Sequence, residues 1–182
     1  PPGPDEPATE NYGITASDRI GQGSIGEKFQ DNLSAIRLIN QLQTENRLPT
    51  VSEQGVLARY IGWGGMKAVF PRADGSFPKG WEARHTELQS LIRPEEYEAA
   101  RRSVLDAHYT SETIVRAMWD LAARLGFRGG NVLESSVGIG PFFGMMPPGL
   151  RNDSALTGVE LDRITGLIAK YLYPKANILA PI

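Results

Sequence analysis

The stretch that decides the fold of this chain reads NVLESSVGIG and covers residues 131–140. It predicts a short buried strand that ends at Glu134 and then turns through Gly138 and Gly140. Glycines at such a strand-to-helix turn let the backbone approach a ligand closely. A carboxylate at the strand end repels phosphate and favours an ammonium or hydroxyl group. We therefore expect a site on a parallel α/β sheet for a ligand with a positive amino group.

The residues that follow extend this sheet. Residues 155–160 predict a second strand, 176–179 predict a third, and the apolar spacing within 164–172 predicts a helix between them. Glu160 ends the second strand, where nucleotide-binding α/β folds place the carboxylate that accepts both ribose hydroxyls. The alternative is a solvated carboxylate that caps the next helix. Leu161 would offer an apolar face to an adenine ring, although a core leucine is equally ordinary.

The first part of the chain is predicted to be helical. Apolar residues recur every three or four positions within 27–46, which predicts a helix with one buried face. Thr50 and Glu53 form a capping-box pattern, and the helix that they start is expected to run to the GWGG turn at residues 62–65. Two more helices are expected at 82–92 and 94–105.

Another helix is predicted from Ser111 or Glu112 to Gly126, with Thr110 or Ser111 as its N-cap. Its apolar side chains form a broad stripe that we expect to be buried, made of Ile114, Val115, Met118, Leu121, Ala122 and Leu125. These patterns predict an α/β fold in which a helical N-terminal region is followed by a partial, Rossmann-like parallel sheet. We expect a proline-rich flexible tail or linker at 1–11, a helical region at 12–106 and the ligand-binding sheet at 107–182.

Two other features have ordinary interpretations. The stretch GQGSIG at residues 21–26 matches the dinucleotide fingerprint, but no apolar strand precedes it and no acidic residue closes a second strand afterwards. We interpret it as a turn that leads into the next helix. Trp63 could stack on a base, yet a tryptophan packed beneath a glycine turn is the commoner case.

Composition narrows the function classes. With 182 residues, 41% of them hydrophobic, the chain suits one domain or one domain with a helical annex. Its net charge of -2 lacks the basic excess of a nucleic-acid module, so any DNA contact must be local or come from other parts. The chain has no cysteine and two histidines, which leaves too few ligands for common metal sites. No apolar run predicts a membrane span and no signal peptide opens the chain, so we expect a cytoplasmic protein without a membrane partner.

Several motifs together resemble a known family. YTS at 109–111, LESSVGIGPF at 133–142 and GVELD at 158–162 are similar to motifs X, I and II of class I S-adenosylmethionine-dependent N6-adenine DNA methyltransferases. Segments upstream resemble the methylase part of very large methylase-helicase proteins of plasmids, phages and conjugative elements. These upstream segments are YGIT at 12–15, KFQDN at 28–32, ARYIGWGG at 58–65 and AHYT at 107–110.

The resemblance implies S-adenosylmethionine as the cofactor. By this resemblance Glu134 contacts the amino group of the methionine moiety, Glu160 binds the ribose and Thr110 touches the carboxylate end. The implied cofactor-binding residues are Tyr109, Thr110, Glu134, Ser136, Gly138, Gly140, Glu160 and Leu161. The methyl group passes, in such enzymes, to the exocyclic nitrogen of an adenine flipped out of the duplex. DNA, and a helicase domain in the same or a partner chain, are the implied partners.

The sequence also departs from this family. Catalysis there depends on an Asn/Asp-Pro-Pro-Tyr/Phe tetrapeptide, which this chain lacks, so we assign no catalytic residue. Ser135 and Pro141 replace residues usual in motif I. We expect the cofactor-binding half of a methyltransferase, inactive by itself. The alternatives are a non-catalytic methyltransferase-like module that binds DNA or docks a protein, and a nucleotide-binding or structural domain of another kind.

Overall fold

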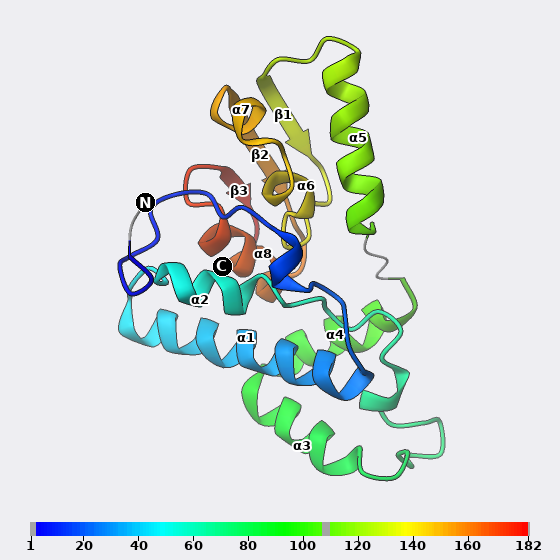
Figure 1. Cartoon of the computed structure of the whole chain (residues 1–182). Coiled ribbons are helices and arrows are strands. Elements are labelled where there is room, and N and C mark those ends of the chain that lie inside the picture. Colours follow the sequence, from blue (N-terminus) through cyan, green and yellow to red (C-terminus); the bar gives the residue numbers. More distant parts are fainter. Residues whose placement is uncertain (1–2, 107–109, 182) are drawn as a thin grey trace.

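The computed structural model describes residues 3–106 and 110–181 of the chain. The strands and α5 lie at one end of the molecule, and α1, α3 and α4 lie at the other (Figure 1). The elements are the 3₁₀ turns η1 (Ala16–Asp18) and η2 (Lys67–Val69), the helices α1 (Ile25–Glu45), α2 (Val51–Leu57), α3 (Glu82–Leu91), α4 (Pro94–Asp106), α5 (Glu112–Arg124), α6 (Pro141–Gly144), α7 (Pro148–Asn152) and α8 (Arg163–Leu172), and the strands β1 (Gly130–Glu134), β2 (Ser154–Val159) and β3 (Asn177–Leu179).

The three strands form one parallel sheet in the order β1-β2-β3. Glu134, the last residue of β1, pairs with Gly158 of β2. Because the carboxyl ends of parallel strands meet at one edge of a sheet, Glu134 and Glu160 lie at the same edge. The predicted parallel α/β arrangement and its three strands are therefore confirmed.

The turn at 21–26 leads into α1 as expected. Gly21 and Gly23 adopt positive φ angles of 69° and 98°, which favour glycine. Ser24 is the N-cap of α1, and its hydroxyl accepts a hydrogen bond from the backbone N–H of Glu27. The Glu27 carboxylate accepts in return from the Ser24 N–H at 2.7 Å. This reciprocal capping box satisfies the free amides at the helix start.

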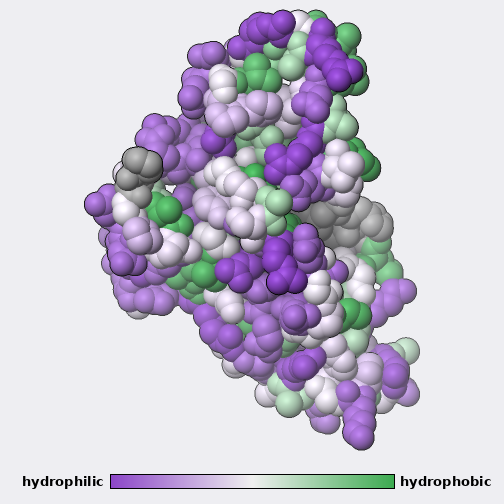
Figure 2. Space-filling model, in the orientation of Figure 1, coloured by the Kyte–Doolittle hydropathy of each residue, from purple (hydrophilic) through white to green (hydrophobic). Residues whose placement is uncertain are grey.

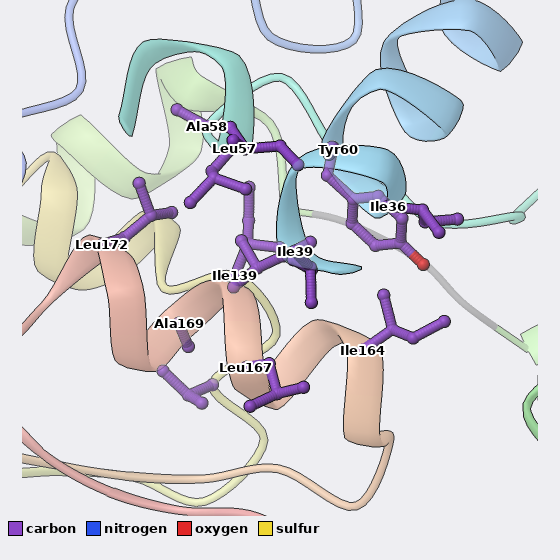
Figure 3. Close-up of a cluster of buried hydrophobic side chains, with 14 of the residues drawn as sticks. Ile36, Ile39, Leu57, Ala58, Tyr60, Ile139, Ile164, Leu167, Ala169 and Leu172 are labelled. Atoms are coloured by element: carbon purple, nitrogen blue, oxygen red, sulfur yellow. The ribbon is translucent and has the colours of Figure 1, made fainter. Parts of the chain in front are cut away.

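One hydrophobic core joins the helices to the sheet. The buried cluster includes residues from Ile14 to Ile178, and α8 contributes five of its members. Side chains from α1, α2 and α8 converge in it, among them Ile39, Leu57 and Leu172 (Figure 3). Burial of each such side chain contributes about 1.5–3 kcal/mol to stability. The helical region and the sheet are thus stabilised by the same core.

The N-terminal segment 3–11 turns at residues 4–5 and then lies against the body of the protein. Ala8 is buried, and its N–H donates to the Pro49 carbonyl at 2.8 Å. The Ser52 N–H donates to the Pro4 carbonyl at 2.9 Å. The amides at the start of α2 therefore find acceptors in this segment, which differs from the solvated linker expected from composition.

The predicted burial of the α5 stripe is wrong for most of its residues. Val115 is buried and Trp119 donates its indole N–H to the Phe142 carbonyl, so one face of α5 packs against α6. The opposite side chains are half-exposed or more, and we call them the α5 stripe: Ile114, Met118, Leu121 and Leu125. Leu133 of the neighbouring edge strand β1 is also exposed. Hydrophobic residues (green) appear along the edge of the molecule where α5 lies (Figure 2).

A largely buried ion pair joins α4 to α8. The Arg163 Nη1 lies 2.7 Å from the Glu96 Oε1, and the side chains are 15% and 7% exposed. The other oxygen of Glu96 accepts from the backbone N–H of Arg93 at the start of α4. Arg163 also donates to the Gln43 side chain of α1. This cluster holds α4 beside the carboxyl edge of the sheet.

Candidate functional site

A cavity of about 780 Å³ lies at the carboxyl edge of the sheet. One wall is formed by the ends of β1 and β2 and by the turn after β1, from Glu134 to Gly138. The facing wall is formed by α4 and by the loop at residues 60–63. The volume falls within the usual range for small-molecule sites.

The turn after β1 has the conformation that its glycines predict. Gly138 has a φ of 56° and Gly140 a φ of 80°, both in the left-handed region. Gly138 lines the cavity, whereas Gly140 is buried and does not line it. A Cβ on Gly140 would lie 2.2 Å from the ring of the buried Tyr173, whose hydroxyl donates to the Gly140 carbonyl at 2.6 Å. Gly140 therefore shapes the turn by permitting close packing.

Glu160 is fixed by the backbone at the end of β2. Its Oε2 accepts from the N–H of Gly138 at 3.0 Å, and its Oε1 accepts from the N–H of Asp162 at 2.8 Å. The carboxylate thus connects the glycine turn to the start of α8. Each carboxylate oxygen has a further lone pair, so Glu160 can still accept hydrogen bonds from a ligand diol. The Asp162 side chain is the N-cap of α8, where it accepts from the backbone of Thr165.

Glu134 differs from Glu160 in how its carboxylate is placed. Its side chain is partly buried and lines the cavity. Among residues 3–106 and 110–181, it makes no hydrogen bond or ion pair. An ionised carboxylate in this position gains most from a cationic donor. It is therefore suited to bind an ammonium group.

The structure brings most of the predicted site residues to one cavity. Its lining includes Thr110, Glu134, Ser136, Gly138, Glu160 and Leu161. Leu161 is 88% exposed, which leaves its apolar side chain free to contact a ligand. Ser111 is the N-cap of α5, but its side chain makes no capping bond. Tyr109 lies outside the described residues.

Sequence reasoning missed the wall made by the helical region. Trp63 lines the cavity although it is buried, and it packs against Phe29 beneath the glycine turn, as expected. The loop that carries it is held by the buried Asn32, which accepts from the Ile61 N–H and donates to the Gly62 carbonyl. The helix α2 ends at Leu57 rather than at Gly62, which leaves this loop free to face the sheet. On α4, the lining residues are Ala99, Ala100, Arg102 and Ser103.

The GQGSIG turn does not belong to this cavity. It lines a second hollow of about 650 Å³ at the start of α1, together with Arg19 and Arg84. The Glu27 carboxylate already occupies the amides at this helix start, where an anion would bind. The turn is therefore a helix cap.

Comparisons of the chain with protein-family models, with curated proteins and with solved structures find no match. Across the described residues, no cluster of three or more His, Cys, Asp or Glu side chains could hold a metal ion. No helix in this part of the chain is long and apolar enough to cross a membrane.

Proposed function

We propose that this chain is the cofactor-binding part of an adenine-specific DNA methyltransferase and that its cavity binds S-adenosylmethionine. One observation carries the proposal: two carboxylates, Glu134 and Glu160, end adjacent parallel strands and line one cavity on either side of a glycine turn. Nucleoside ligands bind at this edge of open α/β sheets. A Rossmann-like methyltransferase sheet would place the same groups there.

Each part of the ligand has a matching group in the cavity. Glu134, whose carboxylate is engaged by no other described residue, binds the ammonium of the methionine moiety. Glu160, already oriented by two backbone amides, accepts the ribose hydroxyls with its remaining lone pairs. Leu161 covers one face of the adenine. Three carboxylates around the cavity, including Asp162, disfavour a ligand with phosphates.

The reaction itself requires groups outside this chain. The methyl group leaves the sulfonium of S-adenosylmethionine and bonds to the N6 of an adenine, which loses a proton. The tetrapeptide that holds this amino group in related enzymes is missing from the sequence. We infer that these residues bind and orient the cofactor, and that DNA and a helicase domain are partners of the larger protein.

Calorimetric titration of S-adenosylmethionine into the 182-residue chain tests the proposal. We expect micromolar binding, weakened at least tenfold by Glu134→Gln and by Glu160→Gln and abolished by Gly138→Val. Glu82→Gln, at an exposed carboxylate of α3 outside the cavity, is the matched control and should bind normally. ATP should not compete. An absence of heat and of thermal stabilisation at millimolar S-adenosylmethionine would reject the proposal.

A second candidate function is a non-catalytic docking module. It is favoured by the exposed α5 stripe beside the edge strand β1, because contiguous exposed apolar side chains mark interaction surfaces. Under this alternative the chain binds a neighbouring protein or DNA and ignores S-adenosylmethionine. Glu134→Gln would then leave partner binding unchanged, whereas Met118→Glu would abolish it.

A further inference from the structure

The α4 side of the cavity carries a positive charge, opposite in sign to the carboxylates at the strand ends. Its lining from the sheet side carries the carboxylates of Glu134, Glu160 and Asp162. Among the described residues that line it, the one cationic side chain is Arg102, on the facing helix α4. A ligand held between these walls therefore meets negative charge on one side and a guanidinium on the other.

The Arg102 side chain has free donors. Its Nε donates to the Glu98 carbonyl one turn earlier in α4, at 3.3 Å. Among residues 3–106 and 110–181, its two terminal nitrogens have no hydrogen-bond or ion-pair partner. A guanidinium whose terminal N–H groups are free can bind a carboxylate through two parallel hydrogen bonds.

The preceding residue, Arg101, shows what a paired arginine on this helix looks like. Its Nε and Nη2 both bind the Glu98 carboxylate, at 3.2 and 3.1 Å. Arg101 does not line the cavity. The two neighbours thus share a residue type and a helix, but only Arg102 faces the ligand space with unpaired donors.

The position of Arg102 is fixed by its helix. The ion pair of Glu96 with Arg163 fixes α4 to α8, which starts beside Glu160. The Gly65 N–H also donates to the Val104 carbonyl at 3.1 Å, which joins the end of α4 to the loop beside the cavity. Because the helix is held in place, its charged group can favour ligands that carry a group of opposite charge at the matching position.

We propose that Arg102 binds the α-carboxylate of an amino-acid-bearing nucleoside and makes this head group a requirement for tight binding. The inference rests on the proposed function and extends it to the helical region. Glu134 takes the ammonium of the zwitterionic head and Arg102 takes its carboxylate, which the three carboxylates of the facing wall would otherwise repel. The ligand class is then S-adenosylmethionine and S-adenosylhomocysteine rather than nucleosides without a carboxylate.

The test compares ligands with and without the carboxylate, titrated into the 182-residue chain. Arg102→Ala should weaken the binding of S-adenosylmethionine and S-adenosylhomocysteine about 10- to 100-fold, which is the range expected for the loss of a charge-assisted hydrogen bond. The same variant should change the affinity for 5′-methylthioadenosine and for decarboxylated S-adenosylmethionine less than twofold. Arg102→Lys should recover part of the loss, because it keeps the charge without the paired donors. Arg101→Ala is the matched control and should bind all four ligands normally.

The outcomes separate the two proposals. Equal losses for ligands with and without the carboxylate would make Arg102 structural and overturn the inference. Unchanged affinity of Arg102→Ala for S-adenosylmethionine would overturn it too, while leaving the proposed function intact. If the wild-type chain binds none of the four ligands, the proposed function is wrong and this inference falls with it.

Discussion

Replacing Glu96 with glutamine should destabilise the protein far more than removing any surface carboxylate. The Glu96 and Arg163 side chains are nearly enclosed, with their closest N and O atoms 2.7 Å apart. Two unit charges about 4 Å apart attract by about 4 kcal/mol at an effective dielectric constant of 20. The Nε of Arg163 is buried and has no hydrogen-bond partner among the residues that the structure describes, so the guanidinium has few other acceptors. Glutamine can restore a hydrogen bond that contributes about 1 kcal/mol, so we expect the free energy of unfolding to fall by about 3 kcal/mol.

Urea unfolding followed by circular dichroism measures this loss, and the melting temperature should fall by about 6–12 °C. Glu98→Gln is the control, because the pair of Glu98 with Arg101 on the same helix is about half exposed and contributes less than about 1 kcal/mol. The double variant Glu96→Leu with Arg163→Met should recover most of the stability, since it leaves no unpaired buried charge. Equal losses for Glu96→Gln and Glu98→Gln would refute the reasoning.

Three further predictions concern packing, pH and exposure. Gly140→Ala should lower the unfolding free energy measured in urea by about 2–5 kcal/mol, because the residue has a positive φ and an added Cβ would clash with the Tyr173 ring. An unchanged urea midpoint would contradict this. Burial lowers the pKa of His85, so the unfolded chain, whose histidines titrate near pH 6.5, binds its proton more readily than the folded protein. Stability should therefore fall as the pH drops from about 7 to 5, and His85→Phe should reduce that fall; parallel pH profiles for the two proteins would exclude a role for His85. Met118→Gln in the α5 stripe should change the unfolding free energy by less than about 0.5 kcal/mol, whereas Trp119→Ala should cost about 3–5 kcal/mol; a large loss for Met118→Gln would mean that the stripe is covered.

Local patterns in the sequence predict the elements well. The capping box predicted at Thr50 forms, because it depends only on residues three apart. The strand at 130–134 and its glycine turn follow from contiguous residues in the same way. These features could be predicted because their energetics are decided within one or two turns of chain.

The features that could not be predicted depend on which elements meet in space. Helical spacing predicts one broad apolar stripe on α5, but it does not say that Val115 packs inward while Met118 stays exposed. The sequence likewise predicts α4 without showing that Arg102 faces the carboxyl edge of the sheet. That placement rests on the pairing of Glu96 with Arg163, which are 67 positions apart. Such contacts leave no periodic signal.

The shared core has a consequence for how the protein is made. The buried face of α1 packs against α8, and Gln54 donates its side-chain amide to the Tyr171 carbonyl, so the earliest helices depend on the last one. At a synthesis rate of about 5–20 residues per second, the ribosome needs roughly 6–25 s to add α8 after α1 has been made. During that delay the nascent helices expose an apolar surface with no partner yet translated. Newly made chains should therefore require chaperone protection until α8 emerges, and slower translation downstream of α1 should lower the folded yield.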